Sequence, residues 1–378
     1  MKKILYSGND ASGRNQSGFI DAGSNRDALD SLHQQGLNDV QLHDDAALAI
    51  PRDDLDRLSP KQQAALAKFE LQLRQHPSTL TFIRGILWQS RWLITLGVGL
   101  IGWGLYSDTL WLWLCGIPIA TALPAYALLN YRTAQRYDAL LRASALGENQ
   151  QVRELVEQLK PQFTQPEMAF DLAIRNACAL RDSEPLATAL ESLTPWRHAI
   201  EESSPGMFEG QTALVFHAYR KYDGFLQQMR LAYRHSNESP TIAVDLALTE
   251  ARFGDLERAE ELLASIMKEQ LPPHGQPFIH WTRGLIAKRR GEPEARQHLR
   301  TALTGLTAIG ESPAVWPALA LCAGYYLSVL DPERDKEEAE LLMGMFGEIL
   351  MGGGDGLLHT ELCTKVHVLH QRHRIINS

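Results

Sequence analysis

The sequence predicts a mainly α-helical protein with three parts: a small N-terminal ββα module, a two-helix transmembrane hairpin and a C-terminal α-solenoid. Two observations support this fold class. Residues 92–131 contain a single charged residue, Asp108. Beyond residue 131, turn-forming residues recur every 32 to 40 residues between helical patterns, a period typical of stacked helical hairpins. We expect the divisions 1–45, 46–85, 86–131, 132–350 and 351–378.

Composition excludes several classes of protein. The chain has 378 residues, of which 44% are hydrophobic and 22% charged, as is usual for a folded protein. Its net charge of −8 argues against a dedicated nucleic-acid binder, because such proteins carry a basic excess. The four cysteines form no CxxC pair, which argues against a disulfide framework and a cysteine-rich zinc site; they are Cys115, Cys178, Cys322 and Cys363.

The N-terminal module has the pattern of two strands followed by a helix. Residues 3–8 and 17–22 read as strands joined by a turn rich in Gly, Asn and Asp. Ser24 is placed to cap a helix whose apolar side carries Ala28, Leu29 and Leu32, and Gly36 would end it. Val40 and Leu42 indicate a third strand.

The order of residues in this module resembles the N-terminal module of the inner-membrane platform proteins of type II secretion and type IV pilus systems. The matching positions are Tyr6, Asp10, Gly13, Gly18, Ile20, Ala22, Ala28, Leu32, Gly36 and Leu37. The resemblance covers about 45 residues and implies a cytoplasmic docking module at a bacterial inner membrane, in a secretion or pilus-type assembly. A generic small ββα cap is the alternative interpretation.

Residues 46–85 read as a linker and a helix. The linker is acid-rich, and the helix begins at Ser59 and Pro60 with Leu66 and Phe69 on its apolar side.

Two apolar runs then predict a membrane hairpin. The second, residues 110–131, would reach about 33 Å as a helix, enough to cross a hydrocarbon core of about 30 Å. The first, residues 92–106, is shorter and needs Arg91 to extend to the interface. Basic residues flank the outer ends of both runs, so the positive-inside rule places both termini in the cytoplasm. A buried helical hairpin in a soluble core is the alternative.

The region after residue 132 has regularly spaced turn signals. They are Gly147-Glu148-Asn149, Asp182-Ser183-Glu184, Tyr222-Asp223-Gly224, Gly254-Asp255, Gly291-Glu292 and Asp331-Pro332. In the clearest unit, residues 241–272, small Ala247 and Ala259 permit close helix packing and Gly254 permits the turn. The next unit has Gly284 in the place of Ala247.

This pattern resembles tetratricopeptide repeat (TPR) proteins, with five or six degenerate repeats between about residues 137 and 350. An irregular helical bundle is the alternative. The glycine-rich residues 351–356 are expected to end the array, and a last helix to cap it.

Basic residues near the ends of the first helices are the candidate binding residues. Stacked cations of this kind can bind a carboxylate-rich peptide. They can equally complement the negative ends of helix dipoles, worth about 0.3–1 kcal/mol each. The candidates are Arg181, Arg220, Lys221, Arg252, Lys288 and Arg289.

The sequence contains no recognisable catalytic, phosphate-binding or metal-binding motif, and we expect no enzyme activity, cofactor or metal. The predicted function is a membrane-anchored scaffold or adaptor on the cytoplasmic face of the inner membrane. Its expected partners are proteins or peptides, acidic ones in particular, and membrane lipid, but not nucleic acid. One alternative is a membrane-tethered chaperone or regulator that captures client peptides. The other is a metal-dependent enzyme that uses the terminal residues His359, Cys363, His367, His370 and His373.

Overall fold

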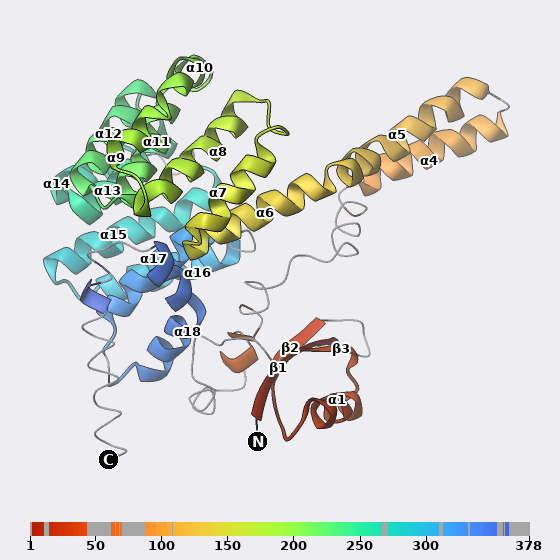
Figure 1. Ribbon diagram of the computed structural model, residues 1–378, viewed down its shortest axis with the longest axis horizontal. Coiled ribbons are helices and arrows are strands. Elements are labelled where there is room, and N and C mark those ends of the chain that lie inside the picture. Colours follow the sequence, from red (N-terminus) through yellow and green to blue (C-terminus); the bar gives the residue numbers. More distant parts are fainter. Residues whose placement is uncertain are drawn as a thin grey trace. The chain divides into compact units, whose positions relative to one another are not determined.

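The computed structural model is mainly helical, with a small three-stranded antiparallel sheet near the N-terminus (Figure 1). It describes residues 2–10, 15–43, 62–64, 66–67, 69, 88, 90–107, 109–266, 271–309, 313–331, 333–353, 358 and 360–362. Backbone contacts divide the chain into two compact units, one of Met1–Leu71 with Leu140–Ser378 and one of Gln72–Ala139. The predicted mainly α class with an N-terminal sheet is confirmed.

The N-terminal module has the predicted order of elements. Strands β1 (Lys2–Asn9), β2 (Asn15–Ala22) and β3 (Asn38–His43) pair in the order β2-β1-β3, and helix α1 (Asn25–Gln34) connects β2 to β3. The Ser24 hydroxyl accepts a hydrogen bond from the Asp27 N–H at 3.2 Å, which caps α1 as predicted. Gly36 follows α1 with φ +83°, a left-handed conformation that glycine adopts without strain.

Both faces of this sheet are covered. Ile4 is fully buried with Ala28 of α1 on one face, and Leu5 packs with Phe19 and Ala67 on the other. Residue Ala67 belongs to a helical stretch that is described at residues 62–64, 66–67 and 69. The module therefore shares its second face with a segment that follows it in the sequence.

The same stretch also contacts the last helices of the chain. Leu66 packs against Leu341 and Met345 of α18 (Lys336–Gly353). The Phe69 ring lies 6.2 Å from that of Trp316 and 5.1 Å from that of Phe346, centroid to centroid. The predicted helix with Leu66 and Phe69 on its apolar side is thus found, at the residues that are described.

The second unit contains a tight helical hairpin, as predicted. Helices α4 (Arg91–Tyr106) and α5 (Leu110–Leu129) approach closely at two glycines. A Cβ atom added to Gly97 would lie 2.7 Å from the Cβ of Ala120, and one added to Gly116 would lie 2.6 Å from the Gly97 carbonyl oxygen. Only glycine allows this packing without displacing the backbone.

The predicted membrane crossing, however, is wrong. Among the described residues, none of the helices combines the length with the apolar character that a membrane span requires. Helix α4 ends after 16 residues, about 24 Å, whereas a hydrocarbon core measures about 30 Å. This finding overturns the predicted localisation, a two-helix protein of a bacterial inner membrane with both termini in the cytoplasm.

The remaining helices form successive pairs joined by short turns (Figure 1). They are α6 (Tyr131–Leu146), α7 (Asn149–Leu159), α8 (Pro166–Ala179), α9 (Leu186–Glu191), α10 (Arg197–Ser203), α11 (Met207–Ala218), α12 (Tyr222–His235), α13 (Pro240–Phe253), α14 (Leu256–Ser265), α15 (Gln276–Arg290), α16 (Ala295–Ile309), α17 (Trp316–Val329) and α18. The pairs are regular from α11 onward. Between α8 and α11 the short helices α9 and α10 replace a single second helix.

Most of the predicted turns lie between helices. Gly147 and Gly291 both have φ +73°, and the Asp255 carboxylate caps α14 by accepting from the Glu257 N–H at 2.8 Å. The turn predicted at Tyr222-Asp223-Gly224 is wrong, because α12 already begins at Tyr222. The chain turns instead at Arg220, which adopts φ +57°, and Lys221.

The small residues predicted to lie between packed helices are buried there. Ala247 and Ala259 are fully buried. A Cβ atom on Gly284 would lie 2.6 Å from the Leu299 Cγ, so glycine is needed for α15 to pack on α16 at this distance.

Candidate functional site

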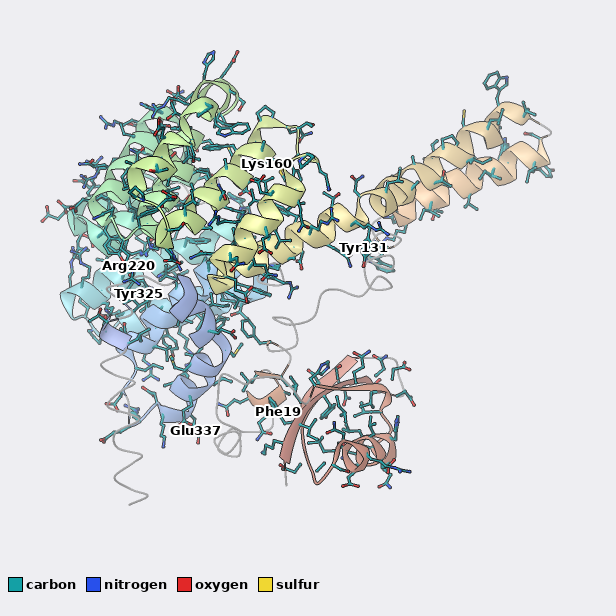
Figure 2. All side chains as sticks on the ribbon, in the orientation of Figure 1. Phe19, Tyr131, Lys160, Arg220, Tyr325 and Glu337 are labelled. Atoms are coloured by element: carbon teal, nitrogen blue, oxygen red, sulfur yellow. The ribbon has the colours of Figure 1, made fainter. Side chains whose placement is uncertain are left out.

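Four side chains near the C-terminal ends of α11, α13, α15 and α17 form the candidate site. They are His217, Arg252, Lys288 and Tyr325, and we call them the Arg252–Lys288 surface. They follow one another at intervals of 35, 36 and 37 residues, so each successive helix pair contributes one of them. Figure 2 labels Tyr325, which is the member on α17.

Arg252 lies at the centre of this surface. Its Nη2 donates to the His217 Nε2 at 2.9 Å, and its Nε donates to the Tyr325 hydroxyl at 3.4 Å. The guanidinium carbon lies 4.5 Å from the Phe253 ring centroid and 6.0 Å from that of Phe225, within the range of cation–π attraction. These contacts hold the planar guanidinium in one orientation, with its Nε and Nη2 both engaged inside the protein.

Lys288 supplies the second cation. Its Nζ lies 5.8 Å from the centroid of the Tyr325 ring and 2.8 Å from the Glu361 Oε2. Tyr325 therefore contacts both cations, through its hydroxyl and its ring. The surface already accommodates one carboxylate, that of Glu361, which comes from near the end of the chain.

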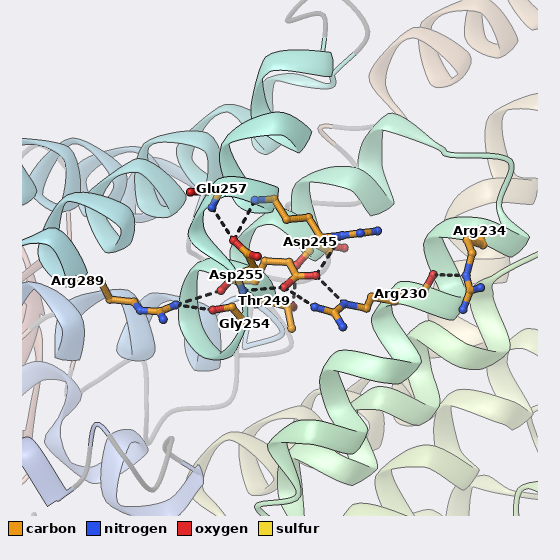
Figure 3. Close-up of polar contacts among 10 residues, drawn as sticks. Arg230, Arg234, Asp245, Thr249, Gly254, Asp255, Glu257 and Arg289 are labelled. Atoms are coloured by element: carbon orange, nitrogen blue, oxygen red, sulfur yellow. Dashed lines mark hydrogen bonds and ion pairs between the residues drawn. The ribbon is translucent and has the colours of Figure 1, made fainter.

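Arg289 has a different role. Its Nη1 donates to the backbone carbonyls of Glu250, Ala251 and Gly254 at 3.3, 3.2 and 3.0 Å. Figure 3 shows Arg289 directed at Gly254. These carbonyls end α13, so Arg289 satisfies groups that a helix C-terminus leaves unpaired and lies at the negative end of its dipole. Of the two explanations for the basic pattern, helix-end stabilisation accounts for this residue.

Arg181, Arg220 and Lys221 lie outside the Arg252–Lys288 surface. Arg181 follows α8 in a short 3₁₀ helix and its Nε lies 3.7 Å from the Asp182 carboxylate. Arg220 (labelled in Figure 2) and Lys221 are exposed in the turn between α11 and α12. Arg220 and Lys221 were expected to be the binding residues of this helix pair. The residue of the pair that belongs to the Arg252–Lys288 surface is His217 of α11.

Sequence reasoning missed His217 and Tyr325 as members of the site. A lone histidine or tyrosine in a helix has no local signature that separates a packed residue from a binding residue. The usable signal was their spacing from Arg252, 35 residues upstream for His217 and 73 downstream for Tyr325, close to one and two periods of the array.

Asp245 lies two turns before Arg252 on α13 and introduces a pH-dependent charge. The surrounding protein raises the pKa of its carboxyl group to about 6 by desolvation, although the side chain is still exposed to solvent. Because the pKa is raised above that of the unfolded chain, the native state is favoured by protonation. The contribution of Asp245 protonation to the free energy of unfolding is fully present below about pH 4 and is lost as the pH rises through about 6.

We expect Asp245→Asn to stabilise the protein more at pH 7.5 than at pH 4. The asparagine removes a carboxylate that is disfavoured in the fold, and this matters only where the carboxylate is charged. Urea unfolding of both chains at the two pH values measures the difference, and carbon NMR of the Asp245 carboxyl should give a midpoint near 6. A midpoint near 4 with equal effects at both pH values would contradict this assignment.

Within the part of the chain that the structure describes, the His, Cys, Asp and Glu side chains form no cluster suited to a metal ion. The terminal residues proposed for a metal-dependent enzyme, His359, Cys363, His367, His370 and His373, lie outside the described residues. The Arg252–Lys288 surface itself offers two cations, aromatic rings and hydrogen-bond donors.

Comparison of the chain with family models, with curated proteins and with solved structures gave no match in any of the three.

Proposed function

We propose that the helical pairs form a TPR-like array that binds an acidic peptide segment of a partner protein at the Arg252–Lys288 surface. The observation that carries the proposal is the placement of Arg252 and Lys288 on neighbouring first helices, with Tyr325 contacting both. Arginine presents paired donors to a carboxylate, and a lysine nearby adds a second positive charge. The protein would thus act as a scaffold or adaptor, and components of a secretion or pilus-type assembly are the partners that the N-terminal resemblance suggests.

The aromatic residues around Arg252 support this role. Tyr222 and Phe253 stack with their ring centroids 4.5 Å apart and their planes at 8°. Phe225 packs edge-on to His217 at 5.3 Å. Rigid aromatic neighbours lower the entropy lost when Arg252 engages a ligand, which is how preorganisation raises affinity.

We expect Arg252→Ala and Lys288→Ala each to weaken binding of an acidic peptide by about tenfold, because a hydrogen bond to a charged group contributes about 1.5–3 kcal/mol. The probe is a fluorescein-labelled peptide of alternating Glu and Leu residues, and fluorescence anisotropy measures the dissociation constant. Binding by the unchanged chain should weaken as salt is added, because screening reduces the attraction between charges.

Arg153→Ala is the matched control, since Arg153 is an exposed arginine on α7. It removes the same charge at a position outside the Arg252–Lys288 surface. If all three variants lost affinity equally, the peptide would be responding to overall charge and the proposal would fail.

A further inference from the structure

A piece of the chain's own C-terminal region lies against the Arg252–Lys288 surface. We call residues 358 and 360–362 the C-terminal segment; they are helical where described. Glu361 forms the 2.8 Å ion pair with Lys288. Leu358 is only 2% exposed, and Leu362 is also buried.

Leu358 anchors the segment on α17. A Cβ atom added to Gly324 would lie 2.8 Å from the Leu358 Cδ2, so the leucine packs directly on the helix backbone beside Tyr325. Leu358 and Glu361 are three residues apart and therefore share one face of a helix. This face presents an apolar side chain and a carboxylate to α17 and α15 together.

The contact has the chemistry of the ligand proposed for this surface. The Glu361 carboxylate forms an ion pair with Lys288, which is one of the two cations that an acidic peptide would need. Lys288 is 21% exposed and Glu361 is 38% exposed, and ion pairs of such partial exposure are weak. The segment is therefore held mainly by leucine burial and can be replaced by a segment of similar pattern.

We propose that the C-terminal segment is an internal ligand of the Arg252–Lys288 surface, and that a partner must displace it with an acidic helical segment that carries a leucine three residues before its carboxylate. This inference rests on the proposed function, because it assigns the same surface a partner pattern and a regulatory contact. A partner can bind only the chains in which the surface is open. Its apparent affinity is therefore the intrinsic affinity multiplied by the fraction of open chains.

The central test compares Glu361→Lys with Glu348→Lys in the full chain. Glu348 is an exposed glutamate of α18, so the two variants change the net charge equally. Glu361→Lys places a second cation beside Lys288 and should open the surface. We expect it to bind the labelled Glu/Leu peptide about threefold or more tightly than Glu348→Lys does. Glu361→Gln, a milder change, should act in the same direction.

A second measurement needs no partner peptide. Hydrogen exchange followed by mass spectrometry should show faster exchange of the C-terminal segment in Glu361→Lys, and recovery of protection when Lys288→Glu is added to restore the pair with exchanged charges. Unchanged exchange in Glu361→Lys would overturn the inference.

A third measurement separates the inference from the proposed function. A labelled peptide that copies residues 355–366, with Cys363→Ser, should bind the Glu361→Lys chain more tightly than the unchanged chain. If it does so while the Glu/Leu peptide binds neither, the proposed function fails and the internal contact stands. If the Glu/Leu peptide binds the unchanged, Glu348→Lys and Glu361→Lys chains equally, the function stands and the internal ligand is refuted.

Discussion

Replacing Glu250 with Ala is expected to lower the free energy of unfolding by about 3 kcal/mol. Glu250 is 0% exposed, and its carboxylate joins α13 to α12 and α14. Oε1 lies 2.7 Å from the Arg230 Nε on α12 and 3.3 Å from the Arg258 Nε on α14. Oε2 accepts from the Arg230 Nη2 at 2.9 Å and from the Asp255 N–H at 3.1 Å.

The expected loss of stability depends on whether the arginine partners of Glu250 can be solvated once the carboxylate is removed. Breaking a buried ion pair by removing one partner costs about 3–5 kcal/mol when the other charge stays buried. Here the remaining arginines are partly exposed, Arg230 at 37% and Arg258 at 48%. They can be solvated in the variant, so we place the loss at the lower end of that range. The Asp255 N–H also loses its side-chain acceptor, which loosens the turn between α13 and α14.

Urea unfolding followed by circular dichroism measures this change. Glu250→Gln keeps the shape and one acceptor oxygen but not the charge or the second acceptor, so it should lose less than Glu250→Ala. The matched control is Glu260→Ala, since Glu260 pairs with Arg290 through two contacts of 2.7 Å at an exposed position. Exposed pairs contribute little because water and salt screen them. Losses of similar size at Glu250 and Glu260 would contradict the importance of burial.

The fold was predictable where local signals agreed. Ser24 and Gly36 marked the two ends of α1, and Gly254 with Asp255 marked a turn, because capping and left-handed conformations have strong residue preferences. The turn at Arg220 was misplaced because these residue preferences are not absolute. A non-glycine residue took the left-handed conformation there, while Gly224, the expected turn residue, lies inside α12.

The apolar run at residues 92–131 shows a second limit. Hydrophobicity predicted the two helices, but the transmembrane hairpin that it also predicted is not supported, because crossing a membrane depends on helix length as well. The first apolar run, residues 92–106, was already short and needed Arg91 to extend to the interface. The observed helix begins at Arg91 and does not reach it.

The candidate site was predictable only in part. Arg252 and Lys288 were found from their charge and spacing, and the structure brings both to Tyr325. Arg289, one residue further, was indistinguishable from Lys288 in the sequence, yet it faces the end of α13. One residue along a helix rotates the side chain by about 100°, so neighbouring cations can serve different surfaces.

Trp316 is the residue whose truncation should cost most. It is 1% exposed, its ring lies 6.2 Å from that of Phe69, and the Arg142 guanidinium carbon lies 5.1 Å from its centroid. Truncating a buried tryptophan leaves a large cavity, and we expect Trp316→Ala to lower the free energy of unfolding by about 3–5 kcal/mol. The loss should extend to the contact between Phe69 and Phe346, because the cavity opens beside Phe69.

Trp316→Phe should be far milder, with a loss of about 1 kcal/mol or less. The indole Nε1 is buried and, among the residues that the structure describes, has no hydrogen-bond partner, and a buried donor left unpaired is destabilising by about 1–3 kcal/mol. Phenylalanine removes that donor while keeping most of the ring, so the relief offsets part of the lost volume. Urea unfolding of both variants tests this, with Trp103→Ala, an exposed tryptophan of α4, as the control for loss of an indole. A phenylalanine variant as unstable as the alanine variant would mean that the indole N–H does have a partner in solution.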